Sequence, residues 1–270
     1  MSEETHRAAL SGRTAVVTGV GRRRGIGFAI ASRLARAGAD VVVQHWAPHD
    51  AEQPWGADDV DALLAELETQ LAPGARLAAT SLDLAAPTAG EELVARAADA
   101  MGHLDVLVCN HARSGGDGRL ADQTAETLDA HWAVNARSTL LATQAFAAQH
   151  DGRPGGRVVW MTSGQIAGPM PGEIAYAASK AVLAGLTASV ADDLIDRGIT
   201  LNTVNPGPVN TGYLDADAAP AEVVDAVLAH FPGGRFGEPD DPARLVEWLV
   251  SDAGRWVVGQ VLSTEGGFRR

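Results

Sequence analysis

Short apolar runs alternate with amphipathic stretches along almost the whole chain of 270 residues. Runs rich in β-branched residues are typical of buried strands, and apolar residues three and four positions apart are typical of helices. Strands are predicted at residues 14–18, 40–44, 76–81, 104–109, 157–162, 200–205 and 257–263, with helices between them. This alternation predicts an α/β fold with a single doubly wound parallel sheet of about seven strands and helices on both faces.

The chain length suits one domain, so residues 1–270 are interpreted as a single dinucleotide-binding and catalytic domain. Ligands in such sheets bind beyond the carboxyl ends of the strands. Residues 208–221 follow the sixth predicted strand and are rich in Pro, Asn, Asp and Gly. We expect this segment to be a lid over the substrate, with a plain surface loop as the alternative.

A glycine-rich turn from Thr18 to Gly27 joins the first predicted strand to a helix. Glycines there let a pyrophosphate approach the backbone amides at the helix start, where the helix dipole favours its charge. Three consecutive arginines, residues 22–24, lie inside the turn, and no acidic residue ends the second strand, where residues 44–46 are Gln-His-Trp. The pattern favours a 2′-phosphate and hence NADP(H), with NAD(H) possible. Pairing of the arginines with acidic side chains is the alternative.

Tyr176 and Lys180 are four residues apart at the start of a predicted helix, so both side chains lie on one helix face. A nearby ammonium is expected to lower the pKa of a phenol, which lets the pair exchange a proton with an alcohol or carbonyl. Ser163, just past the fifth strand, is expected to hydrogen-bond the substrate oxygen. Lys180 is the only lysine of the sequence and Tyr176 is one of two tyrosines. A solvated helix face is the competing interpretation of the pair.

Several motifs in order resemble the short-chain dehydrogenase/reductase family along nearly the whole chain, which implies a Rossmann-type fold. The resemblance implies catalytic residues Asn135, Ser163, Tyr176 and Lys180, with Asn135 holding a water that links the lysine to solvent. It implies an adenine contact at Asp83, a motif closing the fourth strand at 109–112, and a nicotinamide contact at Thr211. The predicted cofactor residues are Gly19, Arg22, Arg23, Arg24, Gly25, Ile26, Gly27, Asp83, Leu84, Asn110, Tyr176, Lys180, Pro206, Gly207, Val209 and Thr211.

The sequence departs from the family pattern in two places. The glycine turn is two residues longer than usual, and Cys109, His111 and Ala112 replace the Asn, Ala and Gly of the Asn-Asn-Ala-Gly motif. His111 is either a substrate contact or a structural residue. Gln165 and Glu173, between Ser163 and Tyr176, either meet a polar group of the substrate or lie on the surface.

Composition limits the partners. A net charge of −13 disfavours nucleic acid, and the histidines lack metal-ligand spacing, so no metal is expected. With a single cysteine, Cys109, the chain can form no internal disulfide. The sequence shows neither an apolar leader nor an apolar run long enough to span a bilayer. We therefore expect a cytoplasmic protein without a membrane partner. Small residues along the helix at 175–195 and the family resemblance favour a homotetramer.

Together these features predict an NAD(P)-dependent oxidoreductase that acts on a ketone or secondary alcohol. The resemblance is strongest to reductases of the 3-oxoacyl-(acyl-carrier-protein) type, so a small molecule or an acyl-carrier conjugate is the expected substrate. A sugar or polyol dehydrogenase is the main alternative among enzymes. A dinucleotide-sensing protein without catalysis is the alternative from another class, but a sensor has no need of Ser163, Tyr176 and Lys180 together.

Overall fold

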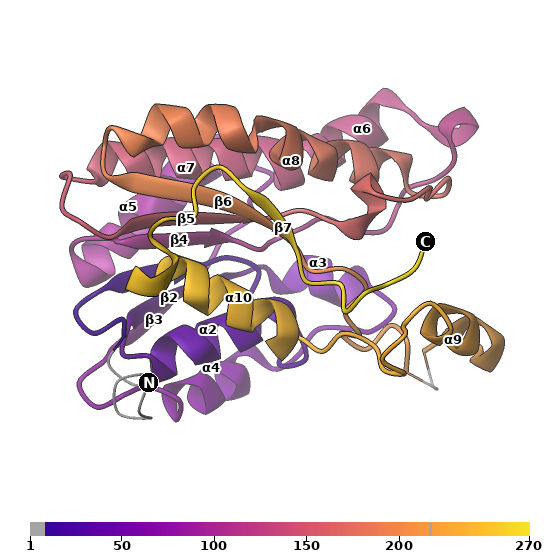
Figure 1. Cartoon of the computed structure of the whole chain (residues 1–270), viewed down its shortest axis with the longest axis horizontal. Helices are drawn as coiled ribbons and strands as arrows, with labels where there is room; N and C mark the ends of the chain where they lie inside the picture. Colours follow the sequence, from indigo (N-terminus) through magenta and orange to yellow (C-terminus); the bar gives the residue numbers. More distant parts are fainter. Residues whose placement is uncertain (1–8, 216–217) are drawn as a thin grey trace.

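Seven parallel strands form one sheet in the order β3-β2-β1-β4-β5-β6-β7 in the computed structural model, which describes residues 9–215 and 218–270 (Figure 1). The strands are β1 (Thr14–Val17), β2 (Asp40–His45), β3 (Leu77–Ser81), β4 (Val106–Cys109), β5 (Gly156–Met161), β6 (Ile199–Asn205) and β7 (Val261–Ser263). The predicted doubly wound sheet of about seven strands is confirmed.

Helices cover both faces of this sheet (Figure 1). One face carries α2 (Ile26–Arg36), α4 (Val60–Glu68) and α10 (Asp240–Val250); the other carries α5 (Ala89–Met101), α7 (Ser138–Gln149) and α8 (Ile174–Ile195). The shorter helices are α3 (Ala47–Glu52), α6 (Ala125–His131) and α9 (Ala221–Leu228). A π-helical turn, η2 (Trp132–Arg137), joins α6 to α7.

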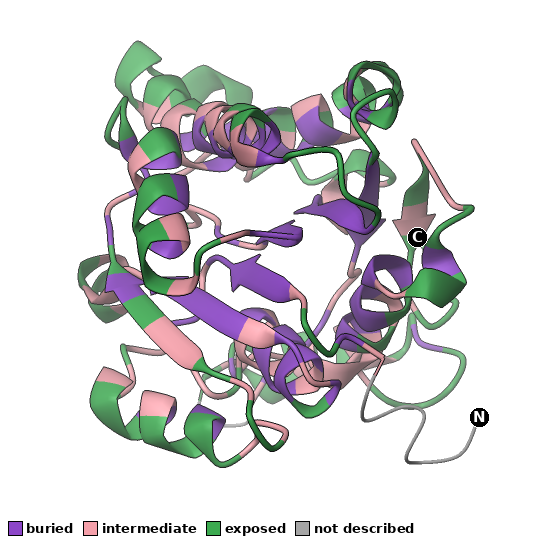
Figure 2. Ribbon diagram, turned by 90° about the vertical axis from the view of Figure 1, so that its left-hand side faces the viewer, coloured by how far each residue is buried: buried purple, intermediate pink, exposed green. Residues whose placement is uncertain are grey.

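The core has two parts because successive side chains of a strand point to opposite faces (Figure 2). In β1, Ala15 and Val17 pack toward α2 and α10, whereas Val16 packs with α5 and α7. The strands are buried along nearly their whole length except at the β3 and β7 edges. Such two-sided burial explains why the strands are near-continuous apolar runs in the sequence.

The order of the strands places a crevice between β1 and β4. After β1 the chain turns to β2 on one side, and β4 returns to the other side of β1. Ligands bind at such a switch point, beyond the carboxyl ends of the strands. The glycine turn, Asn110, Ser163 and Pro206 all follow the carboxyl ends of strands and therefore lie along this one edge.

Candidate active site

The glycine turn is shaped by close contacts between backbone segments. Gly19 has φ +70°, and a Cβ there would lie 2.8 Å from Cα of His111. A Cβ on Gly27 would lie 2.7 Å from Nδ2 of Asn110. The extra residues fold into a tight turn in which Gly25 N donates to Arg22 O at 2.9 Å, and α2 begins at the next residue. The described first turn of α2 holds no acidic residue, and no side chain caps it. The free amides at the start of this helix are therefore available to an anion.

The three arginines of the turn contact groups of the protein. Arg22 donates to Thr211 O at 2.8 Å and lies 5.4 Å from the centre of the Trp55 ring. Arg23 pairs with Glu66 at 2.8 Å, and Arg24 pairs with Asp215. The alternative interpretation, pairing with acidic side chains, therefore describes Arg23 and Arg24. Arg22 also brings Thr211, the predicted nicotinamide contact, to the glycine turn.

A cavity of about 320 Å³ opens beside this turn. It is lined by four of the predicted cofactor residues, Gly19, Asp83, Leu84 and Asn110. Its other walls include groups that the sequence did not single out as cofactor contacts: Gln44, Trp46, His49, Asp50 and Arg113. Trp46 reaches the cavity because α3 turns the segment after β2 over it. The glycine turn and the cavity beside it together fit a dinucleotide.

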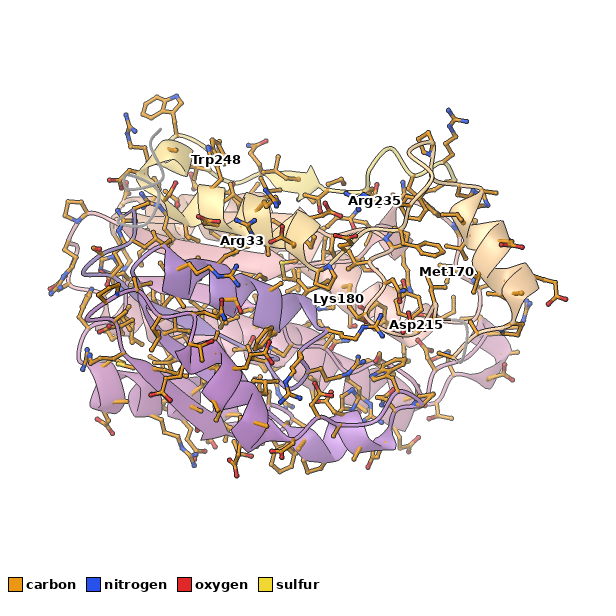
Figure 3. All side chains as sticks on the ribbon, turned by 90° about the horizontal axis from the view of Figure 1, so that it is seen from below. Arg33, Met170, Lys180, Asp215, Arg235 and Trp248 are labelled. Atoms are coloured by element: carbon orange, nitrogen blue, oxygen red, sulfur yellow. The ribbon has the colours of Figure 1, made fainter. Side chains whose placement is uncertain are left out.

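Three of the predicted catalytic residues lie near the start of α8 and the end of β5. Tyr176 lies in the first turn of α8, and its phenol interacts with the side chain of Ser163, which follows β5. Lys180, one turn later, is buried in the interior of the molecule (Figure 3). Its Nζ donates to Met161 O at 3.0 Å and to His111 O at 3.4 Å. Met161 is the last residue of β5 and His111 follows β4, so the ammonium joins α8 to the carboxyl ends of both strands.

The pKa values differ from the expectation. The pKa of Tyr176 is raised to about 12: burial is the largest cause, the Glu173 carboxylate adds to it, and the hydrogen bond with Ser163 opposes it. Burial lowers the pKa of Lys180 to about 8, against a smaller effect of Cys109. The prediction that the ammonium lowers the phenol pKa was wrong for this structure, because desolvation dominates and the ammonium is bound to main-chain carbonyls.

Asn135 lies in the π-helical turn η2 and is fully buried. Its Oδ1 accepts from Arg113 N at 2.6 Å, and its Nδ2 donates to Arg113 O at 3.1 Å and to Ser179 Oγ at 2.9 Å. The whole side-chain amide therefore holds the backbone after β4 against α8. The water link to Lys180 stays a prediction.

His111 is a structural residue. Its Nδ1 lies 2.7 Å from Thr18 Oγ1, and its Nε2 lies 3.0 Å from Val134 O and 2.7 Å from Ser138 Oγ. Because Val134 O only accepts, Nε2 carries the proton. Burial lowers the pKa of His111 to about 3, with a further decrease from Lys180, so the ring is neutral. It ties β1 to the π-helical turn, and both ring nitrogens are used, which leaves none for a substrate.

The segment after β6 is ordered by its own hydrogen bonds. Gly207 has φ +67° and donates from N to Asn205 Oδ1 at 2.9 Å. Val209 forms a bridge with Gly237. Asn210 Oδ1 accepts from Gly212 N and Leu214 N. Of the predicted lid at 208–221, residues 216 and 217 lie outside the described residues, and α9 begins at 221.

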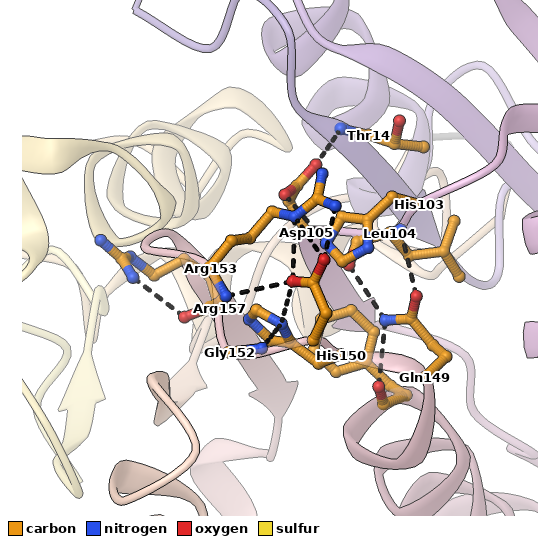
Figure 4. Close-up of polar contacts among 12 residues, drawn as sticks. Thr14, His103, Leu104, Asp105, Gln149, His150, Gly152, Arg153 and Arg157 are labelled. Atoms are coloured by element: carbon orange, nitrogen blue, oxygen red, sulfur yellow. Dashed lines mark hydrogen bonds and ion pairs between the residues drawn. The ribbon is translucent and has the colours of Figure 1, made fainter.

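A polar cluster lies at the opposite, amino edge of the sheet (Figure 4). One nitrogen of His103, one of His150 and an oxygen of Asp151 lie within 4.8 Å of one another. His150 Nδ1 accepts from Gly152 N at 3.3 Å, its Nε2 edge packs on Gly156, and Asp151 pairs with Arg153. His103 Nε2 lies 3.4 Å from Asp105 Oδ1, so the cluster connects the loops before β4 and β5.

Two polar residues that shape the site were not found from the sequence. Gln44, at the end of β2, accepts from Gly19 N at 3.0 Å and donates to Leu82 O at 2.8 Å, so it joins the glycine turn to the segment after β3. Asp117, in the loop after β4, accepts from Tyr176 N at 2.7 Å. The position of Gln44 at a strand end was the available signal, whereas Asp117 lies in a loop without a pattern.

Known proteins resemble this chain over nearly its full length. A family model described as enoyl-(acyl carrier protein) reductase matches residues 19–269. The uncharacterized oxidoreductase YjdA of Bacillus subtilis is 35% identical over 95% of this chain and 96% of that protein. The hydroxynaphthalene reductase-like protein Arp2 of Metarhizium majus is 38% identical over 98% of both chains. A short chain dehydrogenase of Burkholderia cenocepacia, solved in complex with NADP, has a TM-score of 0.80 and 38% identity over 96% of this chain and 98% of that one.

The fold, the site and these relatives define an oxidoreductase that acts on a carbonyl or hydroxyl group. The chain belongs to the short-chain dehydrogenase/reductase family. Its helix α8 is long and apolar enough, by length and composition, to cross a membrane. The helix nevertheless packs on the sheet and carries Tyr176 and Lys180, as a core helix of this fold does.

Proposed function

We propose that this protein is an NADP(H)-preferring ketone reductase. The observation that carries the proposal is the position of Tyr176 in the first turn of α8 beside Ser163, at the carboxyl edge of the sheet, with Lys180 buried one turn later in the same helix. The phenol is protonated at neutral pH, as the proton donor to a carbonyl oxygen has to be.

Each residue has a distinct task in this proposal. The reduced nicotinamide supplies the hydride that the carbonyl carbon receives. Tyr176 gives its proton to the carbonyl oxygen, so the C=O double bond becomes CH–OH. Ser163 donates a hydrogen bond to the same oxygen as negative charge develops there. Lys180 places a cation next to the site and holds the strand ends through Met161 and His111.

The proposed NADP(H) preference rests on the arginines and on the Burkholderia cenocepacia relative. Arg24 and Asp215 form an exposed ion pair, with 57% and 27% of their side chains accessible. Exposed pairs contribute only about 0–1 kcal/mol, whereas a charge-assisted contact with phosphate contributes about 1.5–3 kcal/mol. A 2′-phosphate can therefore replace Asp215 at Arg24. NAD(H) binding is the alternative, and the Asp50 carboxylate in the cavity wall supports it.

The substrate class is proposed from the relatives and tested by assay. The name of Arp2 supports a ketone of the hydroxynaphthalene type, and the description of the family model supports an acyl group on an acyl carrier. The 3-oxo group of that acyl chain is proposed from the sequence motifs alone. A sugar or polyol dehydrogenase remains the alternative activity. We expect NADPH oxidation with ketones of the first two classes and at least roughly tenfold tighter binding of NADPH than of NADH. Turnover only with polyols, or tighter binding of NADH, would contradict the proposal.

We propose a homotetramer in the cytoplasm, without nucleic-acid or membrane partners. Two separate apolar surfaces support the tetramer: Leu186 and Ile195 on α8, and Trp248, Trp256 and Val261 on α10 and near β7. Two different self-complementary contacts build a tetramer of twofold symmetry. The net charge of −13 supports the absence of a nucleic-acid partner, and the single buried Cys109 supports a cytoplasmic location.

Light scattering is expected to give four times the 28.0 kDa mass of one chain. Trp256 is 93% exposed in the single chain, and burying its large apolar surface stabilises one of the two contacts. Trp256→Glu should therefore yield dimers, whereas the same change at the exposed Arg255 should leave the tetramer intact. A monomeric protein at micromolar concentration would contradict the proposal.

A further inference from the structure

The helix that carries Tyr176 and Lys180 has no local cap at its start. The first amides of a helix have no partner within the helix and need acceptors from elsewhere. Glu173 occupies the capping position of α8, but its side chain forms no capping bond. Its carboxylate instead accepts from Gln165 Nε2 at 2.5 Å. The capping acceptors of α8 must therefore come from another segment.

Asp117 and Gly118 supply those acceptors from the loop after β4. Asp117 Oδ2 accepts from Tyr176 N at 2.7 Å, and Asp117 Oδ1 accepts from Ala175 N at 3.1 Å. Gly118 O accepts from Ile174 N at 3.4 Å. All three amides of the first positions of α8 are thus bound by two residues that lie more than fifty positions earlier in the sequence.

The Asp117 carboxylate is itself held in place. Gly118 N donates to its Oδ1 at 2.7 Å, and Gln123 Nε2 donates to the same oxygen at 2.9 Å. Burial acts to raise the pKa of Asp117, but the donors at Tyr176, Gly118, Gln123 and Ala175 outweigh it and hold the pKa below its ordinary value. The group is therefore an anion at neutral pH, at the end of a helix that favours negative charge.

The other side of Tyr176 is bound to the same loop through two side chains. Ser179 Oγ donates to Tyr176 O at 2.8 Å, and Asn135 Nδ2 donates to Ser179 Oγ at 2.9 Å. Asn135 also grips both the N–H and the C=O of Arg113. Both the amide and the carbonyl of Tyr176 are therefore connected to residues 113–118.

We propose that Asp117 is a positioning residue for the reaction, which holds the backbone of Tyr176 so that the phenol hydroxyl stays at Ser163. The proposal rests on the proposed role of Tyr176 as the proton donor. Asp117 touches neither substrate nor the reacting atoms in this role. It acts through the first turn of α8, and a displacement of that turn by about 1 Å is enough to cost roughly 100-fold in rate.

Asp117→Asn tests this role because it removes mainly one contact. The amide oxygen can serve the three donors now at Oδ1, while its NH₂ group then faces Tyr176 N and cannot accept from it. We expect kcat for ketone reduction to fall roughly 10- to 100-fold, with KM for the nicotinamide cofactor unchanged. The matched control is Asp122→Asn, an exposed acidic residue of the same loop region, which should keep the wild-type kcat.

A readout that needs no substrate comes from the two tyrosines of the chain. Labelling with 3-fluorotyrosine gives two ¹⁹F resonances, and Tyr176→Phe assigns them. Asp117→Asn should shift the Tyr176 resonance and leave that of Tyr213 in place, and Asp122→Asn should shift neither. If Asp117→Asn does not fold, Asp117→Ser, which keeps one acceptor, replaces it with the same expectation.

The outcomes separate this proposal from the proposed function. A wild-type kcat together with an unmoved Tyr176 resonance in the Asp117 variant overturns the positioning role. An equal rise of KM for the cofactor at unchanged kcat also overturns it, since that result assigns Asp117 to cofactor binding. If the wild-type protein reduces no ketone, the proposed function fails, and the resonance alone then decides whether Asp117 positions Tyr176.

Discussion

Replacing Tyr176 by phenylalanine is expected to lower kcat for ketone reduction by roughly 10²- to 10⁴-fold, the contribution typical of a general acid. The change removes only the hydroxyl that gives the proton and interacts with Ser163. The ring and the helix remain, so the dissociation constant of NADPH should stay within about twofold of the wild-type value. Steady-state rates and a fluorescence titration of NADPH measure the two quantities.

Tyr213→Phe is the matched control. Tyr213 is the other tyrosine of the chain, and burial and Glu173 raise its pKa to about 12 as well. Loss of its hydroxyl should leave the rate of the chemical step near the wild-type rate.

Ser163→Ala should lower kcat less than Tyr176→Phe does, because it removes a hydrogen-bond donor to the substrate and keeps the proton donor. A Tyr176→Phe enzyme with normal turnover would place the acid elsewhere and leave only the fold in common with the family.

The strands were predictable because each one is buried on both faces. A run such as Val41, Val42 and Val43 fits a parallel strand covered on both sides and little else. The last strand shows the limit of this argument. It was expected from 257, but it begins at Val261, because Gly259 has φ +71° and makes a turn there. This edge strand is partly exposed, so the apolar pattern does not mark its start.

Helix boundaries depended on single side chains that the pattern does not show. The sequence predicts only that helical structure lies between the strands at 40–44 and 76–81; Asp59 accepts from Ala62 N and starts α4 at Val60. The same interval also contains α3, with a proline in its first turn. Proline suits that position, yet six residues are too few to show a helical period.

The candidate catalytic residues could be proposed from the sequence, whereas their supporting contacts could not. Ser163, Tyr176 and Lys180 stand at fixed spacings next to strand ends; in the structure Tyr176 interacts with Ser163, and Lys180 binds the carbonyl at the end of β5. The partners of Arg23 and Arg24 come from α4 and from the segment after β6, so only the folded chain shows the pairs. The pKa of Tyr176 likewise depends on burial among residues that are distant in sequence.

Lys180 provides a sharp test because it carries the only side-chain amine of the protein. Its proposed function is donation to the hydroxyls of the nicotinamide ribose. Acetylation has one target besides the amino terminus, and bound cofactor should slow it and preserve activity, because the ribose would occupy the donors of the ammonium. Mass spectrometry that shows Lys180 fully acetylated in an enzyme with normal turnover would contradict this mechanism.

Lys180→Met is expected to lose turnover and much of the affinity for the cofactor, while Lys180→Arg loses most turnover although it keeps the charge. The guanidinium is larger and planar, and it cannot release a proton because its pKa is above about 12.

The two variants also differ in their dependence on pH. Burial lowers the pKa of Lys180 to about 8, so the wild-type ammonium loses its proton as the pH rises through 8, and cofactor binding should weaken there. Lys180→Arg should bind the cofactor with no such change near pH 8, and Lys180→Met should be weak at every pH. Titration of NADPH by fluorescence between pH 6.5 and about 9.5 distinguishes the three proteins, because the interval spans the shifted pKa on both sides. A wild-type affinity that stays constant across this interval, or that matches the affinity of Lys180→Met, would show that the ammonium does not hold the cofactor.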